Sequence, residues 1–129
     1  MPLLTTGISH HTATLETREK IAIARTEYAS HVKELHELDG VEEVVVVSTC
    51  NRTEIYSIGP KHSREQVRRW LQNMGDLTDA EMDEHCYVRE RELAVRHLFR
   101  VAGGLESLVL GESQIVGQLK DSWQMAREA

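Results

Sequence analysis

The chain has 129 residues, a formal net charge of −6 at pH 7 and a pI of about 5.6, which argues against a nucleic-acid-binding protein that relies on bulk electrostatics. Hydrophobic residues make up 40% and charged residues 28%, as in a soluble domain with its own core. The absence of a long apolar stretch or a secretory pattern in residues 1–8, together with only two cysteines, favours a cytoplasmic protein.

The first third of the chain predicts one strand and two helices. A short strand spans residues 3–9 and is followed by a polar loop. Thr14 is placed to cap a helix that begins at Leu15. A second helix is predicted over residues 26–38, because its apolar residues follow three-to-four spacing, and Asp39 with the glycine after it ends that helix.

Two adjacent strands follow. Residues 43–49 contain a β-branched run that is typical of a buried strand. Residues 51–57 form a second β-favouring run, and the connection is too short for a crossover, so the two strands are expected to pair antiparallel.

The remaining elements are helices and one short strand. Residues 63–66 have the form of a capping box that opens a helix to about Met74, and residues 78–81 form a second box that opens a short helix. A last strand is predicted over residues 86–89, and further helices over residues 90–105 and from residue 114 onward. The order predicts an α+β fold, with a small antiparallel sheet, helices on one face, a ferredoxin-like βαββαβ arrangement and additional C-terminal helices.

Cys50 lies where the buried strand ends, beside Arg52 and several hydrogen-bonding side chains. A thiolate is the reactive form of cysteine, and nearby cationic or hydrogen-bonding groups stabilise it, so this position suits nucleophilic chemistry. The alternative is a free cysteine used as a small buried hydrophobe.

Two further groups are candidates for chemistry. His97 lies at the border of a predicted helix's apolar stripe, where it is either a general acid or base or a satisfied core histidine. Glu112, Gln114 and Gln118 form an acid and amide cluster suited to a small molecule with an amine and a carboxylate. The alternative is an ordinary helix start with solvated glutamines.

Other site types find little support. The histidines and cysteines have no paired-ligand spacing, so no metal site is expected. The dinucleotide-binding glycine pattern is also missing. Two groups of basic residues, over residues 61–69 and 89–100, are interpreted as solvated helix faces rather than phosphate-binding patches.

Three segments resemble those of one family, the glutamyl-tRNA reductases. Residues 48–56 (STCNRTEIY) resemble its catalytic motif, and residues 97–120 (HLFRVAGGLESLVLGESQIVGQLK) resemble its second long motif. Residues 7–10 (GISH), with Arg18 and Glu19, resemble a third. The sequence departs from the family at Ser9, where asparagine is usual, and at Thr14, where proline is usual.

The resemblance implies a two-step chemistry. The family's cysteine attacks the ester between glutamate and its tRNA, tRNA leaves, and NADPH reduces the thioester to glutamate 1-semialdehyde in tetrapyrrole (porphyrin) biosynthesis. By position, Cys50 matches the nucleophile and His97 a histidine important for activity. The positions that match the substrate pocket are Thr49, Asn51, Arg52, Ser107, Glu112, Ser113, Gln114 and Gln118. Arg52 has two competing roles, which are lowering the pKa of the thiol and holding a carboxylate.

The resemblance also implies a domain organisation. Residues 1–112 are expected to form the catalytic, glutamyl-tRNA-binding domain, and residues 113–129 to begin a helix that leads to NADPH-binding and dimerisation domains absent from this chain. The full-length protein is expected to be a homodimer without membrane association, and this chain alone is not expected to complete the reduction. The alternative is a non-catalytic module that binds aminoacylated tRNA or a partner protein.

Overall fold

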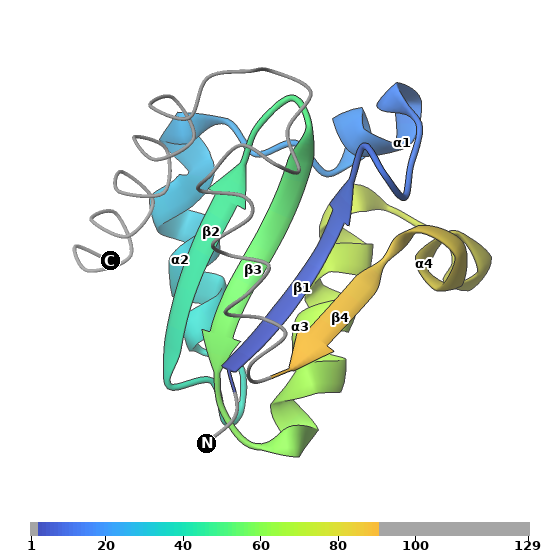
Figure 1. The fold of residues 1–129 in the computed structure, drawn as a ribbon. Helices are drawn as coiled ribbons and strands as arrows, with labels where there is room; N and C mark the ends of the chain where they lie inside the picture. Colours follow the sequence, from blue (N-terminus) through green and yellow to red (C-terminus); the bar gives the residue numbers. More distant parts are fainter. Residues whose placement is uncertain (1–2, 91–129) are drawn as a thin grey trace.

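The computed structural model describes residues 3–90, so the helices predicted beyond residue 90 lie outside the described residues. The described part has an α+β fold built on one sheet of four antiparallel strands (Figure 1). The strands are β1 (Leu3–Ser9), β2 (Glu43–Ser48), β3 (Arg52–Ile58) and β4 (Tyr87–Glu90), and their order across the sheet is β2-β3-β1-β4. Each predicted strand is found within one residue of its expected limits.

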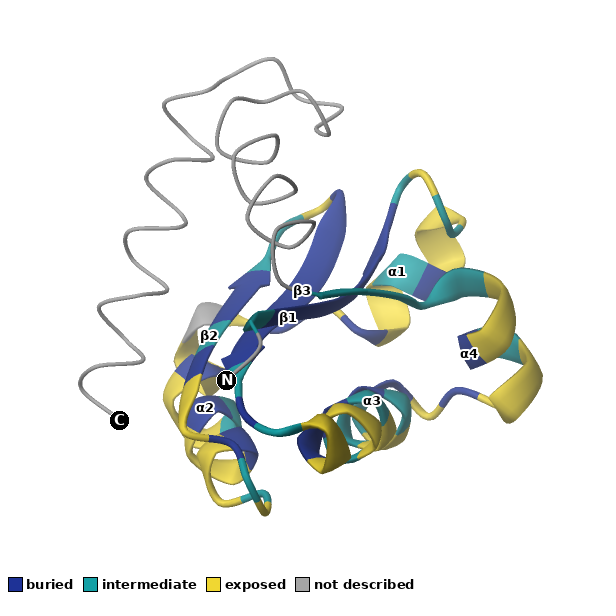
Figure 2. Cartoon of the chain, turned by 60° about the horizontal axis from the view of Figure 1, so that its bottom comes forward, coloured by how far each residue is buried: buried dark blue, intermediate teal, exposed yellow. Residues whose placement is uncertain are grey.

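Two longer helices cover one face of this sheet (Figure 2). They are α2 (Tyr28–His36), which packs against β2, and α3 (Lys61–Gly75), which packs against β1. The shorter elements are α1 (Leu15–Lys20), the 3-10 turn η1 (Arg25–Glu27) and α4 (Asp79–His85). None of the helices within residues 3–90 is long and apolar enough to cross a membrane.

The hydrophobic core lies between the sheet and these two helices. The side chains of a strand alternate between faces, and β1, β2 and β3 each turn apolar side chains toward the core. Full burial of one such side chain stabilises the fold by about 1.5–3 kcal/mol. The strands and the two helices contribute the buried residues Ile8, Val44, Val46, Ile55, Val32, Leu35, Val67 and Leu71.

The opposite face of the sheet is also buried along β3, but there it carries charged and phenolic side chains. Along β3 the side chains of Arg52, Glu54 and Tyr56 alternate with the core residues and are 1%, 0% and 6% exposed. Within the sheet, β1 separates this row from β4, which contributes Tyr87. The sheet thus has a core face and, on the opposite side, a buried polar face that is centred on β3.

Two predicted helix starts differ from the structure. The helix expected from residue 26 begins as the 3-10 turn η1 and becomes α-helical only at Tyr28. The capping box predicted at residues 63–66 is wrong, because α3 already begins at Lys61 with Pro60 as its N-cap. The hydroxyl of Ser63 donates to the Pro60 carbonyl at 2.7 Å and is therefore occupied inside the first turn.

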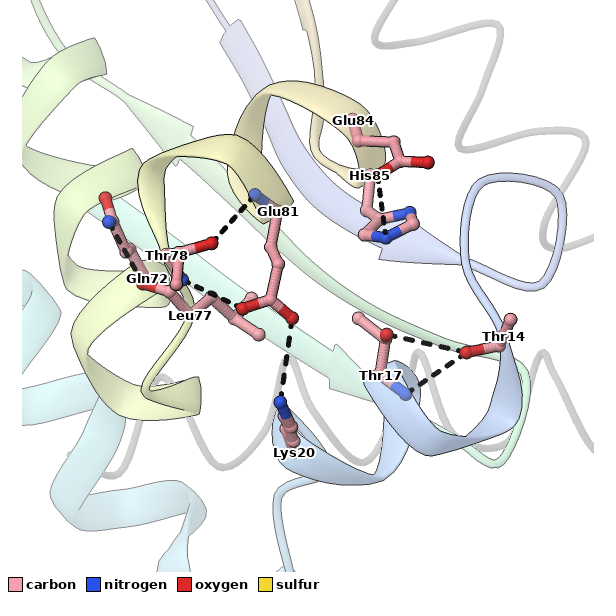
Figure 3. A network of polar contacts seen from close by, with 9 residues as sticks. All are labelled: Thr14, Thr17, Lys20, Gln72, Leu77, Thr78, Glu81, Glu84 and His85. Atoms are coloured by element: carbon pink, nitrogen blue, oxygen red, sulfur yellow. Dashed lines mark hydrogen bonds and ion pairs between the residues drawn. The ribbon is translucent and has the colours of Figure 1, made fainter.

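The second predicted capping box is confirmed. The Thr78 hydroxyl accepts from the Glu81 backbone N–H, and the Glu81 carboxylate accepts from the Thr78 backbone N–H, both at 3.1 Å (Figure 3). That backbone donor, more than any other group, holds the pKa of Glu81 below its usual value. Lys20 lies 3.6 Å from the same carboxylate and links α1 to α4.

Candidate active site

The turn between β2 and β3 contains Cys50 at its apex. The strands pair up to Ser48 and Thr53, and the Thr49 N–H donates to the Arg52 carbonyl at 2.7 Å. The Asn51 N–H donates to the Thr49 hydroxyl at 3.1 Å, which closes the turn. Cys50 is exposed, so the alternative of a small buried hydrophobe is wrong for this residue. The turn presents the thiol to solvent on a closely bonded backbone.

Two other segments hold this turn from the side. The His10 N–H, directly after β1, donates to the Asn51 carbonyl at 2.8 Å. The guanidinium of Arg18, in α1, donates through Nη1 to the Cys50 carbonyl at 2.9 Å and through Nε to the Thr14 carbonyl at 3.4 Å. Figure 1 shows the turn at the same end of the sheet as the end of β1 and α1.

A polar cluster fixes the strand ends below the turn. The hydroxyls of Ser48 and Thr53 lie 2.8 Å apart, and the Thr53 hydroxyl donates to the Ile21 carbonyl at 3.0 Å. The Ile23 N–H donates to the Ser48 hydroxyl at 2.9 Å, and the Ser48 N–H donates to the Tyr28 hydroxyl at 2.7 Å. These bonds connect the turn to the segment between α1 and α2, which limits the movement of the turn.

The buried polar face places a carboxylate two residues beyond Arg52. Glu54 accepts hydrogen bonds from the Tyr56 hydroxyl at 2.9 Å and from the Tyr87 hydroxyl at 2.6 Å. Burial, and then the charge of Glu54, raise the pKa of both tyrosines well above the usual value, while the charge of Arg52 acts in the opposite direction. Arg52 is therefore part of a buried, charged and hydrogen-bonded face that extends across three strands.

Gly7 makes this arrangement possible. In the sheet it lies between Glu54 of β3 and Tyr87 of β4, which both pair with it. A Cβ at this position would lie 2.8 Å from Glu54 Cγ, 2.8 Å from the Thr53 carbonyl oxygen and 3.1 Å from the Tyr87 hydroxyl oxygen. Only glycine leaves room for the carboxylate and the phenol to meet above β1.

Comparison with known proteins places this geometry in a family. The family described as "Glutamyl-tRNAGlu reductase, N-terminal domain" matches residues 6–129. The chain belongs to this family. The Glutamyl-tRNA reductase of Marinobacter nauticus is 45% identical over 99% of this chain, and that of Neisseria meningitidis serogroup B is 42% identical over 99% of it.

A solved structure agrees with this assignment. The Glutamyl-tRNA reductase from Methanopyrus kandleri superposes with a TM-score of 0.78 and 32% sequence identity, covering 98% of this chain. This chain corresponds to 28% of that structure and spans 30% of the length of each of the two bacterial relatives. The family resemblance carried by residues 7–10, 48–56 and 97–120 is thereby confirmed.

Only part of the predicted site of this family member falls within the described residues. The structure brings Thr49, Cys50, Asn51 and Arg52 together at one turn. It adds His10 and Arg18, which the family resemblance includes in its third motif, and Glu54, which lies in the catalytic motif; none of the three was assigned a site role from the sequence. Six predicted residues lie outside the described part of the chain: His97, Ser107, Glu112, Ser113, Gln114 and Gln118.

The second cysteine has a different environment. Cys86 is half-buried and packs against the hydrophobic core, and burial is the main reason that its thiol pKa is raised. A raised pKa disfavours the thiolate at neutral pH, whereas Cys50 is exposed at a turn. Cys86 therefore suits a structural role.

The three arginines of α3 make ion pairs with neighbouring acids. Arg64 pairs with Glu90, and Arg68 lies 2.9 Å from Asp83. Arg69 lies 3.9 Å from Glu65 one helical turn away. These pairs agree with the interpretation of residues 61–69 as a solvated face.

The described residues also form a hollow on the helix side of the sheet. It has a volume of about 450 Å³ and includes none of the predicted site residues. In it, His31 lies between the carboxylates of Glu27 at 3.6 Å and Glu34 at 3.4 Å, and the Trp70 indole donates to Glu34 at 3.1 Å. Because these polar groups bond to one another, we assign no ligand to the hollow.

Proposed function

We propose that this chain is the catalytic, glutamyl-tRNA-binding part of a glutamyl-tRNA reductase of tetrapyrrole biosynthesis. The observation that carries the proposal is the exposed thiol of Cys50 on a turn held by four hydrogen bonds, two between backbone groups and two that involve the side chains of Arg18 and Thr49. An exposed nucleophile on a fixed backbone is what an attack on a large ester substrate requires.

The proposed step is an acyl transfer. The Cys50 thiolate attacks the carbonyl carbon of the glutamyl ester, the bond between this carbon and the tRNA ribose oxygen breaks, and that oxygen takes a proton. The product is a glutamyl thioester and free tRNA. A thioester accepts hydride more readily than an oxygen ester does, so capture by sulfur divides a difficult reduction into two easier steps.

The roles proposed for the other residues come from the family resemblance. His97 is proposed to act in catalysis with Cys50. Arg52 is proposed either to activate the thiol or to hold the glutamate side-chain carboxylate. The remaining proposed substrate-binding residues are Thr49, Asn51, Ser107, Glu112, Ser113, Gln114 and Gln118.

The proposed reaction needs NADPH, which supplies the hydride that reduces the thioester. The four glycines within residues 3–90 lie singly in a strand, in turns and at a helix end, and they do not form a phosphate-binding glycine turn. The described residues therefore do not fit this cofactor, and we assign none of them to its binding.

The organisation proposed for the whole protein follows the same resemblance. Residues 1–112 are proposed to be the catalytic domain, and residues 113–129 to begin the connection to NADPH-binding and dimerisation domains of a cytoplasmic homodimer. The proposed ferredoxin-like classification of the fold is supported by the strand order β2-β3-β1-β4, in which every neighbouring pair is antiparallel.

Mass spectrometry after mixing the chain with glutamyl-tRNA tests the acyl transfer. We expect a glutamyl group on Cys50 after denaturation in acid, no thioester in the Cys50→Ser variant, and nearly unchanged thioester formation in the matched Cys86→Ser variant. If the wild-type chain binds glutamyl-tRNA but carries no glutamyl group, the chain is a binding module. Equal loss in the two variants would contradict the assignment of Cys50.

A further inference from the structure

We propose that Arg18 is a positioning residue for Cys50, an inference that rests on the proposed acyl transfer. Arg18 is 32 residues from Cys50 in the sequence, and its Nη1 donates to the Cys50 carbonyl at 2.9 Å. Arg18 therefore reaches from a separate helix to the backbone of the candidate nucleophile.

A second hydrogen bond fixes the guanidinium of Arg18. Its Nε donates to the carbonyl of Thr14, the N-cap of α1. The Thr14 hydroxyl in turn accepts from the Thr17 N–H at 3.5 Å and lies 3.5 Å from the Thr17 hydroxyl (Figure 3). The guanidinium thus connects two carbonyls, one at the start of its own helix and one at the apex of the turn. A planar group with several donors in fixed directions is suited to such a double contact.

The hydrogen bond from Arg18 and the other hydrogen bonds described for the turn act on different backbone groups. The N–H groups of Thr49 and Asn51 bond within the turn, and the Asn51 carbonyl accepts from His10. The Cys50 carbonyl is the group that Arg18 holds, and its orientation is coupled to the backbone angles of Cys50. Because those angles set the direction in which the thiol points, loss of the bond is expected to misplace the sulfur. A misplacement of about 1 Å can cost a factor of about 100 in rate.

Charge alone does not explain the arrangement. Arg52 is a second cation close to the same end of the sheet, and both Arg52 and Arg18 help to lower the pKa of His10, after burial and His11. The acids of the short helix α1, Glu16 and Glu19, are exposed beside Arg18. A positioning role depends on the hydrogen bond to the carbonyl, whereas a purely electrostatic role would depend only on the positive charge, which lysine retains in full.

The test compares three variants of the 129-residue chain. Arg18→Leu removes the charge and the donors, Arg18→Lys keeps a charge and one donor group, and Arg69→Leu removes an exposed arginine of α3 as the matched control. Single-turnover acylation by glutamyl-tRNA gives a maximum rate and a half-saturating concentration. We expect Arg18→Leu to lower the maximum rate about 10- to 100-fold with less than about a twofold change in half-saturation. Arg18→Lys should recover part of that rate, and Arg69→Leu should match the wild type.

A second readout does not depend on the reaction. Amide hydrogen exchange of Thr49 and Asn51 reports how firmly the turn is closed. We expect Arg18→Leu to reduce the protection of both amides by about tenfold, a loss equivalent to about 1.4 kcal/mol, and Arg69→Leu to leave it unchanged. Unchanged protection, an unchanged maximum rate or a loss confined to half-saturation would each overturn the inference. If the wild type is not acylated, the proposed function fails, and hydrogen exchange still decides the role of Arg18 in the turn.

Discussion

Along β3 the two faces of the sheet are both buried but are stabilised by different interactions. Glu54 and Ile55 are neighbours in β3, and both side chains are 0% exposed. Ile55 packs into the core beneath α2 and α3. Glu54 points to the opposite face, where it accepts hydrogen bonds from Tyr56 and Tyr87. At adjacent positions of one strand, stability thus depends on filled volume on the core side and on hydrogen-bond partners on the polar side.

The difference predicts how each face responds to substitution. Removing methyl groups from an apolar core costs free energy in proportion to the volume lost. For a buried polar group, the loss of stability depends on how many donors or acceptors are left without a hydrogen bond. Removing one member of a hydrogen-bonded pair is therefore more costly than replacing both members by apolar groups. The contrast between these two patterns can be measured at Glu54 and Ile55.

The largest effect is expected at Ile55. Ile55→Ala should lower the free energy of unfolding by about 2–5 kcal/mol, and Ile55→Val by about 0.5–1.5 kcal/mol, because the smaller deletion leaves the smaller cavity. Urea denaturation followed by circular dichroism measures both values. Equal losses in the two variants would show that Ile55 does not pack as a volume-limited core residue.

A somewhat smaller loss is expected at Glu54. Glu54→Gln nearly preserves the shape of the side chain but offers one acceptor oxygen to two phenol donors, so one of them loses its partner. An unsatisfied buried donor costs about 1–3 kcal/mol. The same urea titration measures this loss.

The control for this prediction removes the stranded donor. Tyr87→Phe in the Glu54→Gln background should recover part of the lost stability, although Tyr87→Phe alone should be destabilising. If the two substitutions instead lower the free energy of unfolding additively, no stranded donor exists at Glu54→Gln. The polar face would then not differ from the core in the way proposed.

The smallest effect concerns pH. The folded-state pKa values of Tyr56 and Tyr87 are raised, chiefly by burial and then by Glu54. The two protonated tyrosines therefore stabilise the folded state fully below the ordinary tyrosine pKa of about 10. This contribution is lost as pH rises above that value, because the unfolded chain releases these protons first. Each tyrosine should contribute about 1.4 kcal/mol per pH unit to the decline. Tyr56→Phe should remove one such contribution between pH 10 and 11.5, and an unchanged slope would contradict the assignment.

Most of the sheet could be predicted from the sequence because its signals are local. The β-branched run over residues 44–47 and the short connection after it predict two paired strands, and both are found. The box that begins at Thr78 is likewise formed by residues three apart. The similar pattern at Ser63 failed because Pro60, an earlier residue with an extended backbone, already starts the helix.

Within residues 3–90, the site residues predicted from the sequence are contiguous. Thr49, Cys50, Asn51 and Arg52 belong to one motif, whereas Arg18 reaches the turn from a separate helix, and no spacing rule connects them. The contact of Tyr87 with Glu54 spans 33 residues and is equally invisible to periodicity. One signal did exist, because a glycine inside a predicted strand, such as Gly7, indicates close approach of other groups.

The central position of β1 has a consequence for the order in which the strands can pair during synthesis. β1 ends at Ser9, but its two partners begin at Arg52 and Tyr87. At a synthesis rate of about 5–20 residues per second, the ribosome needs roughly 4–16 s to pass from Ser9 to Tyr87. During that time the nascent N-terminal strand has at least one unpaired edge. Cys50 and the strands β2 and β3 on either side of it emerge before β4 does. The turn can therefore receive its contacts from His10 and Arg18 before β4 completes the polar face. The candidate nucleophile would thus be fixed on the growing chain while the buried carboxylate of Glu54 still lacks the phenol of Tyr87.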